Sequence, residues 1–310
     1  MATAPMTWSL SPTTSAVRFN WFDVDFSAMA SEIENADYVK VTQGLGDLQK
    51  VVLTCVHGSE AEVYLYGGCV TSWKVDGKDL LFVRPDAVFT GYKPIRNMNW
   101  SLVNSENVEG NPCITLELRD GPYCRSMWDY SFHALYKVTL DRNTLSTEIK
   151  ITNTDEKPFS FTTALHTYFR ASAVEASVRG LKGCKTLNKD PDPKNPVEGK
   201  EERDVVTFPG FVDCIFLDVP SELNLDNGLG DLITIKNTNW SDAVLWNPHL
   251  AIESCYKDFV CVENAKLFND VAVSQDPNLL PSADAPLHPK KLHFLQLRDS
   301  GVTYRLGCFI

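Results

Sequence analysis

The chain has 310 residues, of which 44% are hydrophobic and 22% are charged, and this is the composition of an ordinary globular protein with a full core. Its formal net charge is −11 and it has no block of basic residues, so a nucleic-acid partner is not expected. No apolar run approaches the length of a membrane span, so no membrane partner is expected either.

The N-terminal segment is predicted to be a disordered extension over residues 1–40. Residues 1–22 are rich in Ser and Thr and contain no acidic residue, which faintly resembles an organelle transit peptide. The single Arg18 is weak support for that interpretation, and acidic residues follow at once. A cytoplasmic location is therefore expected, with the plastid as the open alternative.

From about residue 50 the sequence predicts one β-strand after another, with turn signals such as YGG, VDGKD, DRNT and LDNGLGD between them. β-Branched and aromatic residues are dense within these runs. The runs are KVVLTC, EAEVYLY, CVTSWKV, DLLFVRP, NWSLVN, CITLEL, SFHALYKVTL, TLSTEIKITN, VVTFPG, DCIFLDV, LITIKNT, AVLWNP and FVCVENA. No segment shows a long helical period. The pattern indicates an all-β fold, a sandwich or barrel of antiparallel sheets.

One charged, proline-rich stretch, NKDPDPKNPVEGKEERD at 188–204, interrupts this series. It is too polar for a core and is predicted to be a surface loop. The strands on its two sides have the same character, so the chain is interpreted as one domain rather than two.

A histidine lies within the predicted strand PFSFTTALHTYFR, residues 158–170. Successive side chains of a strand point to opposite faces. One face then carries Phe159, Phe161, Thr163, Leu165, Thr167 and Phe169, and the other carries Ser160, Thr162, Ala164, His166 and Tyr168. The first face should meet a core, and the second should meet water or a polar ligand. A histidine at a sheet surface often has no chemical role, so this strand alone assigns none to His166.

A carboxylate, Glu263, follows the apolar centre of the predicted strand in KDFVCVENAK. In an extended chain it shares a face with Phe259 and Cys261. An imidazole and a carboxylate that face each other across a pocket make a general acid and a general base. Other polar or aromatic groups in strand-like settings are Asp213, Arg96 and Trp246, which would suit a sugar, with arginine for a phosphate.

The nine cysteines are odd in number and irregularly spaced, with no Cys-x-x-Cys pair and no mixed Cys/His cluster. A disulfide scaffold and a structural zinc site are therefore not expected, and a reducing compartment fits best. The cysteines are interpreted as buried free thiols in strands.

Several long stretches resemble the aldose 1-epimerase superfamily, and more closely its plant glucose-6-phosphate 1-epimerase branch. They include YGGCVTSWKVDGKDLLFVRPDAVF, SFTTALHTYFR, FPGFVDCIFLD and YKDFVCVENAK, and the resemblance covers residues 45–266. It implies a galactose mutarotase-like β-sandwich of large antiparallel sheets, with residues 267–310 as a divergent C-terminal tail. By position, His166 matches the family's general acid, Glu263 its general base, and Arg96 and Asp213 its substrate-binding residues.

The chain departs from the family pattern after GYKPI. In the family this segment runs through Gly-Gly-Ile-Pro and Phe-Pro-Gln-Phe-Gly and ends in His-Gly-Phe-Ala-Arg-Asn, whereas here Ile95 is followed directly by Arg96. A glycine-rich loop, a glutamine and a histidine that line the pocket are therefore missing. The family's closing strand after VENAK has no evident counterpart in the tail.

The resemblance implies a monomeric isomerase that interconverts the anomers of a hexose 6-phosphate without a cofactor or metal. The small-molecule sugar phosphate is the expected partner. The missing segment keeps two alternatives open, namely a non-catalytic carbohydrate-binding β-sandwich and an inactive, partly folded variant. For the same reason, this chain is expected to interconvert the anomers of glucose 6-phosphate weakly or not at all.

Overall fold

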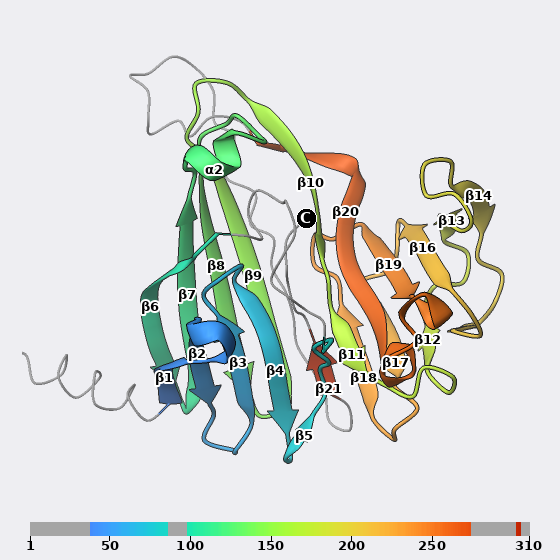
Figure 1. The fold of residues 1–310 in the computed structure, drawn as a ribbon, viewed down its shortest axis with the longest axis horizontal. Helices are drawn as coiled ribbons and strands as arrows, with labels where there is room; N and C mark the ends of the chain where they lie inside the picture. Colours follow the sequence, from blue (N-terminus) through green and yellow to red (C-terminus); the bar gives the residue numbers. More distant parts are fainter. Residues whose placement is uncertain (1–37, 86–97, 274–301, 305–310) are drawn as a thin grey trace, which may run out of the picture.

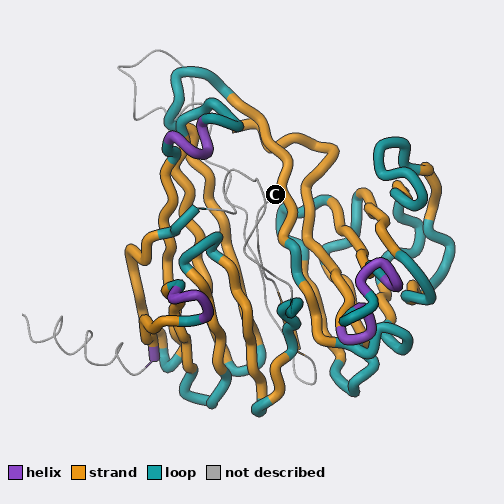
Figure 2. Tube along the Cα trace, viewed as in Figure 1, coloured by secondary structure: helices purple, strands orange, loops and turns teal. Residues whose placement is uncertain are grey.

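The computed structural model describes residues 38–85, 98–273 and 302–304, and for 268–273 and 302–304 it describes backbone pairing only. Residues 1–37 of the N-terminal extension predicted over 1–40, most of the tail and Arg96 therefore lie outside the described residues. The end of that extension was predicted wrongly, because Val39 and Lys40 belong to a strand that pairs with residues 52 and 53. Strands dominate the described part, and its helices are short (Figure 2). The prediction of an all-β fold is confirmed.

The strands form three sheets. The five-stranded sheet has the order β1-β2-β3-β4-β5, with bounds Val39–Gln43, Gln49–Thr54, Glu60–Tyr64, Cys69–Val75 and Lys78–Asp79. The seven-stranded sheet has the order β10-β20-β19-β16-β13-β14, with bounds Phe159–Leu165, Phe259–Val273, Asp242–Asn247, Val212–Leu217, Lys185–Asn188 and Val197–Lys200, and β11 (Tyr168–Arg170) also pairs with β20.

The nine-stranded sheet has the order β15-β12-β17-β18-β21-β9-β8-β7-β6. Its strands span Val205–Thr207, Ser177–Arg179, Glu222–Asp226, Leu232–Lys236, Val302–Tyr304, Thr144–Asn153, Phe132–Asp141, Asn111–Arg119 and Ser101–Val108. Pairing is antiparallel in all three sheets, except that β21 runs parallel to both β18 and β9. Figure 1 shows β21 between the two halves of this sheet. The helices are α2 (Pro122–Arg125) and three 3₁₀ turns, Leu45–Asp47, His249–Ile252 and Tyr256–Asp258.

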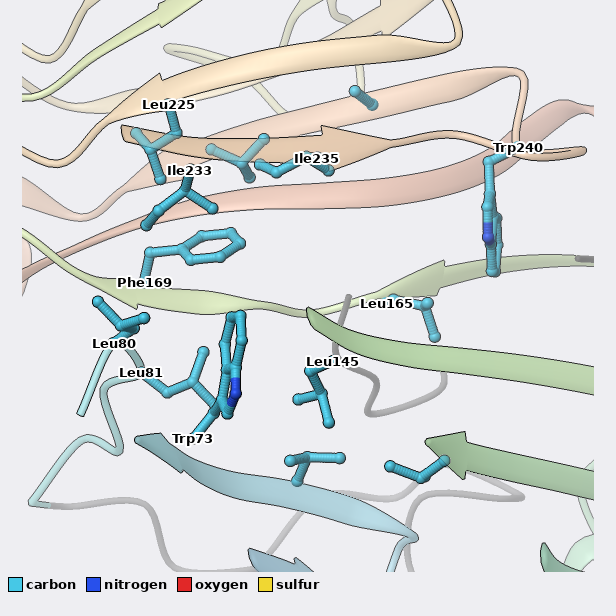
Figure 3. Packing of buried hydrophobic residues seen from close by; sticks show 14 of the residues in the cluster. Trp73, Leu80, Leu81, Leu145, Leu165, Phe169, Leu225, Ile233, Ile235 and Trp240 are labelled. Atoms are coloured by element: carbon cyan, nitrogen blue, oxygen red, sulfur yellow. The ribbon is translucent and has the colours of Figure 1, made fainter. Parts of the chain in front are cut away.

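One contiguous hydrophobic core draws side chains from all three sheets. Figure 3 shows Trp73 of β4, Leu145 of β9 and Phe169 of β11 gathered in this core, with Ile233 and Ile235 of β18 above them. Burying one large apolar side chain stabilises a fold by about 1.5–3 kcal/mol. The core thus fixes β11 against the rest of the sandwich. It thereby also fixes residues 158–170, the segment that carries His166, which we call the site strand.

Two predicted segments differ from the structure. Of the strand expected over 79–85, Asp79 belongs to β5 and Leu81 forms an isolated bridge with Phe169, so no continuous strand forms. The Asp79 carboxylate accepts hydrogen bonds from the backbone N–H groups of Trp73 and Leu81 where the chain leaves β5. The surface loop expected over 188–204 contains β14, whose four residues are all exposed and pair with β13 at the sheet edge.

Strand β20 continues past residue 266 to Val273 and pairs there with the start of β10. The first residues of the predicted tail are therefore part of the seven-stranded sheet. Residues 302–304 form β21, a short strand inside the nine-stranded sheet. Strand pairing in this chain thus does not stop at residue 266.

We expect Phe169→Ala to lower the free energy of unfolding by about 3–5 kcal/mol, because Phe169 is fully buried and its removal leaves a cavity between the sheets. Urea unfolding followed by tryptophan fluorescence measures this change. The matched control is Phe211→Ala, since Phe211 is 42% exposed and the same truncation there should cost less than about 1 kcal/mol. Equal losses in the two variants would contradict the placement of β11 in the core.

Candidate active site

The strand that carries His166 has the two faces that alternation predicts. Phe159, Leu165 and Phe169 are buried in the main core, whereas Ser160 and Thr162 are exposed. The same strand region is divided into β10 and β11, with His166 and Thr167 between them. His166 is on the side opposite the core, and its side chain is 26% exposed.

His166 stands opposite Glu263 on the neighbouring strand β20. Leu165 pairs with Asn264 in β10, and Tyr168 pairs with Cys261 in β11. The two ladders continue in one register, so His166, which lies between them, is opposite Glu263 on β20. A shift in pairing between Phe161 and Thr163 sets this register for the site end of the strand.

The two side chains are in direct contact. His166 Nδ1 lies 2.7 Å from Glu263 Oε1, and the Glu263 side chain is only 4% exposed. His166 Nε2 is buried and has no hydrogen-bond partner among the described residues. The carboxylate therefore orients the ring through one nitrogen and leaves the other directed away from it, as in a histidine that exchanges a proton with a ligand.

A row of four side chains crosses the same face of the sheet. Asp213 of β16 pairs with Trp246 of β19, Trp246 pairs with Cys261 of β20, and Cys261 pairs with Tyr168 of β11. Cross-strand partners share a face, so all four side chains lie on the side of Glu263. We call the surface formed by this row together with His166 and Glu263 the site face.

Aromatic rings make up much of the site face. The ring centroids of Tyr168 and Trp246 are 5.9 Å apart in an edge-on arrangement, and those of Tyr168 and Phe259 are 5.0 Å apart. Phe82 stacks on Phe259 at 5.1 Å. Phe259 is fully buried, so Tyr168 and Trp246, which are partly exposed, are the rings that can offer an apolar face to a sugar ring.

Asp213 is on the site face but does not touch the His166–Glu263 pair. It lies two strands from β20, which corresponds to about 10 Å at the usual strand spacing. Its carboxylate forms an ion pair with Lys189, with Nζ 2.8 Å from Oδ1, and the Lys189 backbone N–H donates to the Asp213 carbonyl. The sequence patterns did not single out Lys189, which directly follows β13.

A cation that the sequence analysis missed lies at the other end of the row. Arg84 hydrogen-bonds to the Tyr168 side chain. Burial raises the pKa of Tyr168, and the charges of Cys261 and Glu263 add to this, while Arg84 opposes it. The sequence signal for Arg84 was weak, because it appeared within the predicted strand DLLFVRP and a stretch matched to the family, but neither gave it a role.

Burial raises the pKa of the Cys261 thiol well above its ordinary value; the Glu263 and Asp213 carboxylates add to this and Arg84 opposes it. Only the thiolate is reactive, and a raised pKa keeps the thiol protonated at pH values where a free cysteine ionises. We therefore expect Cys261 to resist iodoacetamide at pH 8 while the partly exposed Cys69 reacts, as peptide mapping by mass spectrometry will show. Rapid labelling of Cys261 in the folded protein would contradict its burial.

Within the described residues, no group of three or more His, Cys, Asp or Glu side chains is arranged to hold a metal ion. The same part of the chain contains no helix that is long and apolar enough to cross a membrane.

Solved structures with the same fold carry mutarotase names. The crystal structure of "a putative mutarotase" from Salmonella typhimurium matches with a TM-score of 0.66 and 22% identity over 79% of this chain and 95% of that one. The structure of galactose 1-epimerase from Lactobacillus acidophilus matches with a TM-score of 0.57 and 13% identity over 73% and 90% of the two chains. At these identities the likeness shows the fold, a galactose mutarotase-like sandwich.

Two curated proteins are more similar to this chain in sequence than these two solved structures are. A Cenchrus ciliaris protein named "Putative glucose-6-phosphate 1-epimerase" is 33% identical over 271 residues, which cover 74% of this chain and 81% of the relative. An Escherichia coli (strain K12) protein of the same name is 29% identical over 183 residues, covering 55% of this chain and 58% of the relative.

The Cenchrus ciliaris comparison also bears on the missing segment. The comparison spans 271 positions, but 74% of 310 residues is only about 229, so about 42 positions of the relative have no counterpart in this chain. This agrees with a chain that lacks a piece of the family pattern.

The family model described as "Aldose 1-epimerase" matches residues 94–279. The match begins beside the junction of Ile95 and Arg96 and continues past residue 266, as β20 does. It covers more than half of the chain. The protein therefore belongs to the aldose 1-epimerase family, isomerases that act on carbohydrates.

Proposed function

We propose that the protein interconverts the α and β anomers of a hexose 6-phosphate, with glucose 6-phosphate as the first substrate to test. The observation that carries the proposal is the 2.7 Å contact between His166 and Glu263 on the site face. The names of the two curated relatives support the choice of the phosphorylated sugar.

In the proposed reaction Glu263 takes the proton from the anomeric hydroxyl, and His166 donates a proton from Nε2 to the ring oxygen. The bond between the anomeric carbon and the ring oxygen breaks as the carbonyl forms, and the ring opens to the aldehyde. Rotation about the C1–C2 bond then presents the other carbonyl face. Closure reverses both proton transfers and restores the two side chains.

The pair is arranged for these roles by its hydrogen bond. With Nδ1 held by Glu263 Oε1, a protonated His166 directs its second N–H, on Nε2, away from the carboxylate. The carboxylate retains a second oxygen for the anomeric hydroxyl. No hydride moves, Glu263 accepts one proton and His166 supplies the other, so the reaction as written needs no cofactor.

Asp213 and Arg96 are proposed to bind the substrate away from the reacting atoms. Asp213 lies about two strand spacings from Glu263, a distance suited to a hydroxyl on the far side of a sugar ring. Its ion pair with Lys189 has to rearrange or share its oxygens when a hydroxyl arrives. Arg96 is assigned by family resemblance alone.

The test is anomer exchange of glucose 6-phosphate, followed by NMR saturation transfer at increasing protein concentration. The proposal requires exchange above the spontaneous rate and proportional to protein. An exchange rate that rises linearly with protein concentration, and does not rise in the His166→Ala variant, would support the proposal. Exchange indistinguishable from buffer at the highest protein concentration would refute it for this chain.

A carbohydrate-binding protein without catalysis is the second candidate. The absence of about 42 positions present in the Cenchrus ciliaris relative favours it, because a shortened pocket can still bind a ligand that it no longer holds in a reactive pose. Saturable binding of glucose 6-phosphate without exchange would establish this alternative.

The assembly state and the cellular compartment are also matters of proposal. We propose a monomer in a reducing compartment, the cytoplasm or a plastid. Eight cysteines in the described part of the chain are free thiols, which supports the reducing compartment.

A further inference from the structure

Arg84 lies in a segment that the fold holds beside the site strand. The Phe82 backbone N–H donates to the Tyr168 carbonyl at 3.0 Å, and Leu81 forms an isolated bridge with Phe169. Phe82 stacks on Phe259, which is fully buried. These contacts fix the backbone two residues before Arg84, so its position next to β11 is built into the fold.

The Arg84 side chain reaches the site face. It hydrogen-bonds to the Tyr168 side chain, and both Arg84 and Glu263 act electrostatically on Tyr168 and on Cys261. The segment that carries Arg84 lies beside β11, at the end of the row away from β19 and β16. A guanidinium has five N–H donors in a planar fork and can serve several acceptors at once.

The order of these groups matches the order of atoms in a hexose 6-phosphate. The anomeric hydroxyl and the ring oxygen are both bonded to C1, and the ring oxygen is bonded in turn to C5, which carries C6 and its phosphate. If Glu263 takes the hydroxyl proton and His166 serves the ring oxygen, the phosphate extends beyond His166. That direction leads away from Lys189 and toward Arg84.

We propose that Arg84 is a specificity-determining residue that binds the 6-phosphate of the substrate while Tyr168 holds the guanidinium in place. The inference rests on the proposed function for the direction of the sugar. Arginine suits this task because its planar fork binds two phosphate oxygens at once, which a lysine cannot do. Lys189 and Asp213 then serve the hydroxyl end of the ring.

Binding is tested apart from catalysis, by titrating the full chain with inorganic phosphate, glucose 6-phosphate and glucose in turn. We expect Arg84→Gln to raise the Kd for glucose 6-phosphate and for phosphate about 10- to 100-fold, the size of a lost charge-assisted contact, and to leave the Kd for glucose unchanged. Tyr168→Phe keeps the ring and removes only the hydroxyl, so it should weaken phosphate binding by a smaller factor. Arg84→Lys should recover part of the affinity.

Arg119→Gln is the matched control, since Arg119 is an exposed arginine on β7 that pairs with Glu117 and lies in a different sheet. It removes the same charge and should change no Kd. The inference is overturned if wild-type chain binds no phosphate, if Arg84→Gln has no effect, or if it weakens glucose binding equally. Phosphate binding that depends on Arg84 but without anomer exchange would support this inference while rejecting the proposed function.

Discussion

Glu263→Gln is expected to lower the rate of glucose 6-phosphate anomer exchange about 10²- to 10⁴-fold, and His166→Ala is expected to lower it by a similar factor, the range that a positioned general base or acid contributes. A glutamine side chain has nearly the shape of a glutamate but cannot accept the anomeric proton. The rates are measured by saturation transfer at high protein concentration. Thermal unfolding of each variant shows whether the loss is one of chemistry rather than of folding.

The double variant should lose little more than the worse single variant, because both side chains act in one proton-transfer step and are in direct contact. The chain offers a closely matched control in His133 and Glu117, whose Nε2 and Oε1 atoms are also 2.7 Å apart but belong to β8 and β7. Glu117→Gln should leave the rate unchanged. A rate that survives in Glu263→Gln would remove the carboxylate from the mechanism.

The faces of the site strand could be predicted from the sequence, whereas the partner of His166 could not. Side-chain alternation depends on neighbouring residues alone, and it correctly placed Phe169 in the core and His166 on the opposite side. The pairing of His166 with Glu263 joins residues 97 positions apart. It depends on the register shift near Phe161, which no local pattern encodes.

The sequence analysis missed features that depend on contacts with other segments rather than on the hydrophobic pattern of the segment itself. Strand β14 is exposed at every position and lies at a sheet edge, so it carries no hydrophobic alternation to distinguish it from a charged loop. The apolar run DLLFVRP suggested a strand over 79–85. No continuous strand forms there, and the backbone hydrogen bonds that the Asp79 carboxylate accepts where the chain leaves β5 leave little trace in a hydrophobic pattern.

Lys189 and Arg84 were missed for a related reason. Lys189 directly follows β13, and Arg84 lies in the irregular segment after β5; in both settings a charged residue is usually solvated and has no specific role. Their significance comes from what the sheets bring beside them, Asp213 in one case and Tyr168 in the other. The family resemblance assigned roles to His166, Glu263 and Asp213, and it assigned none to these two cations although the matched stretches contain Arg84.

The largest gain in activity is expected from restoring the missing segment. We expect the glycine-rich segment of the family pattern, inserted between Ile95 and Arg96, to raise kcat/KM for glucose 6-phosphate about 100-fold or more. His166 and Glu263 are already in contact without it, so the gain would come from holding the sugar in a reactive pose. A displacement of about 1 Å from such a pose costs on the order of 100-fold.

The control for this experiment is a Gly/Ser linker of the same length at the same junction, which restores the spacing but none of the pocket-lining side chains. It should give little or no gain. His166→Ala in the restored chain should abolish the gain, because a better pose accelerates nothing without the proton donor. If the chain without the segment is as fast as the restored one, the segment is dispensable. The site face, with Arg84 and Asp213 at its two ends, would then suffice to position the substrate.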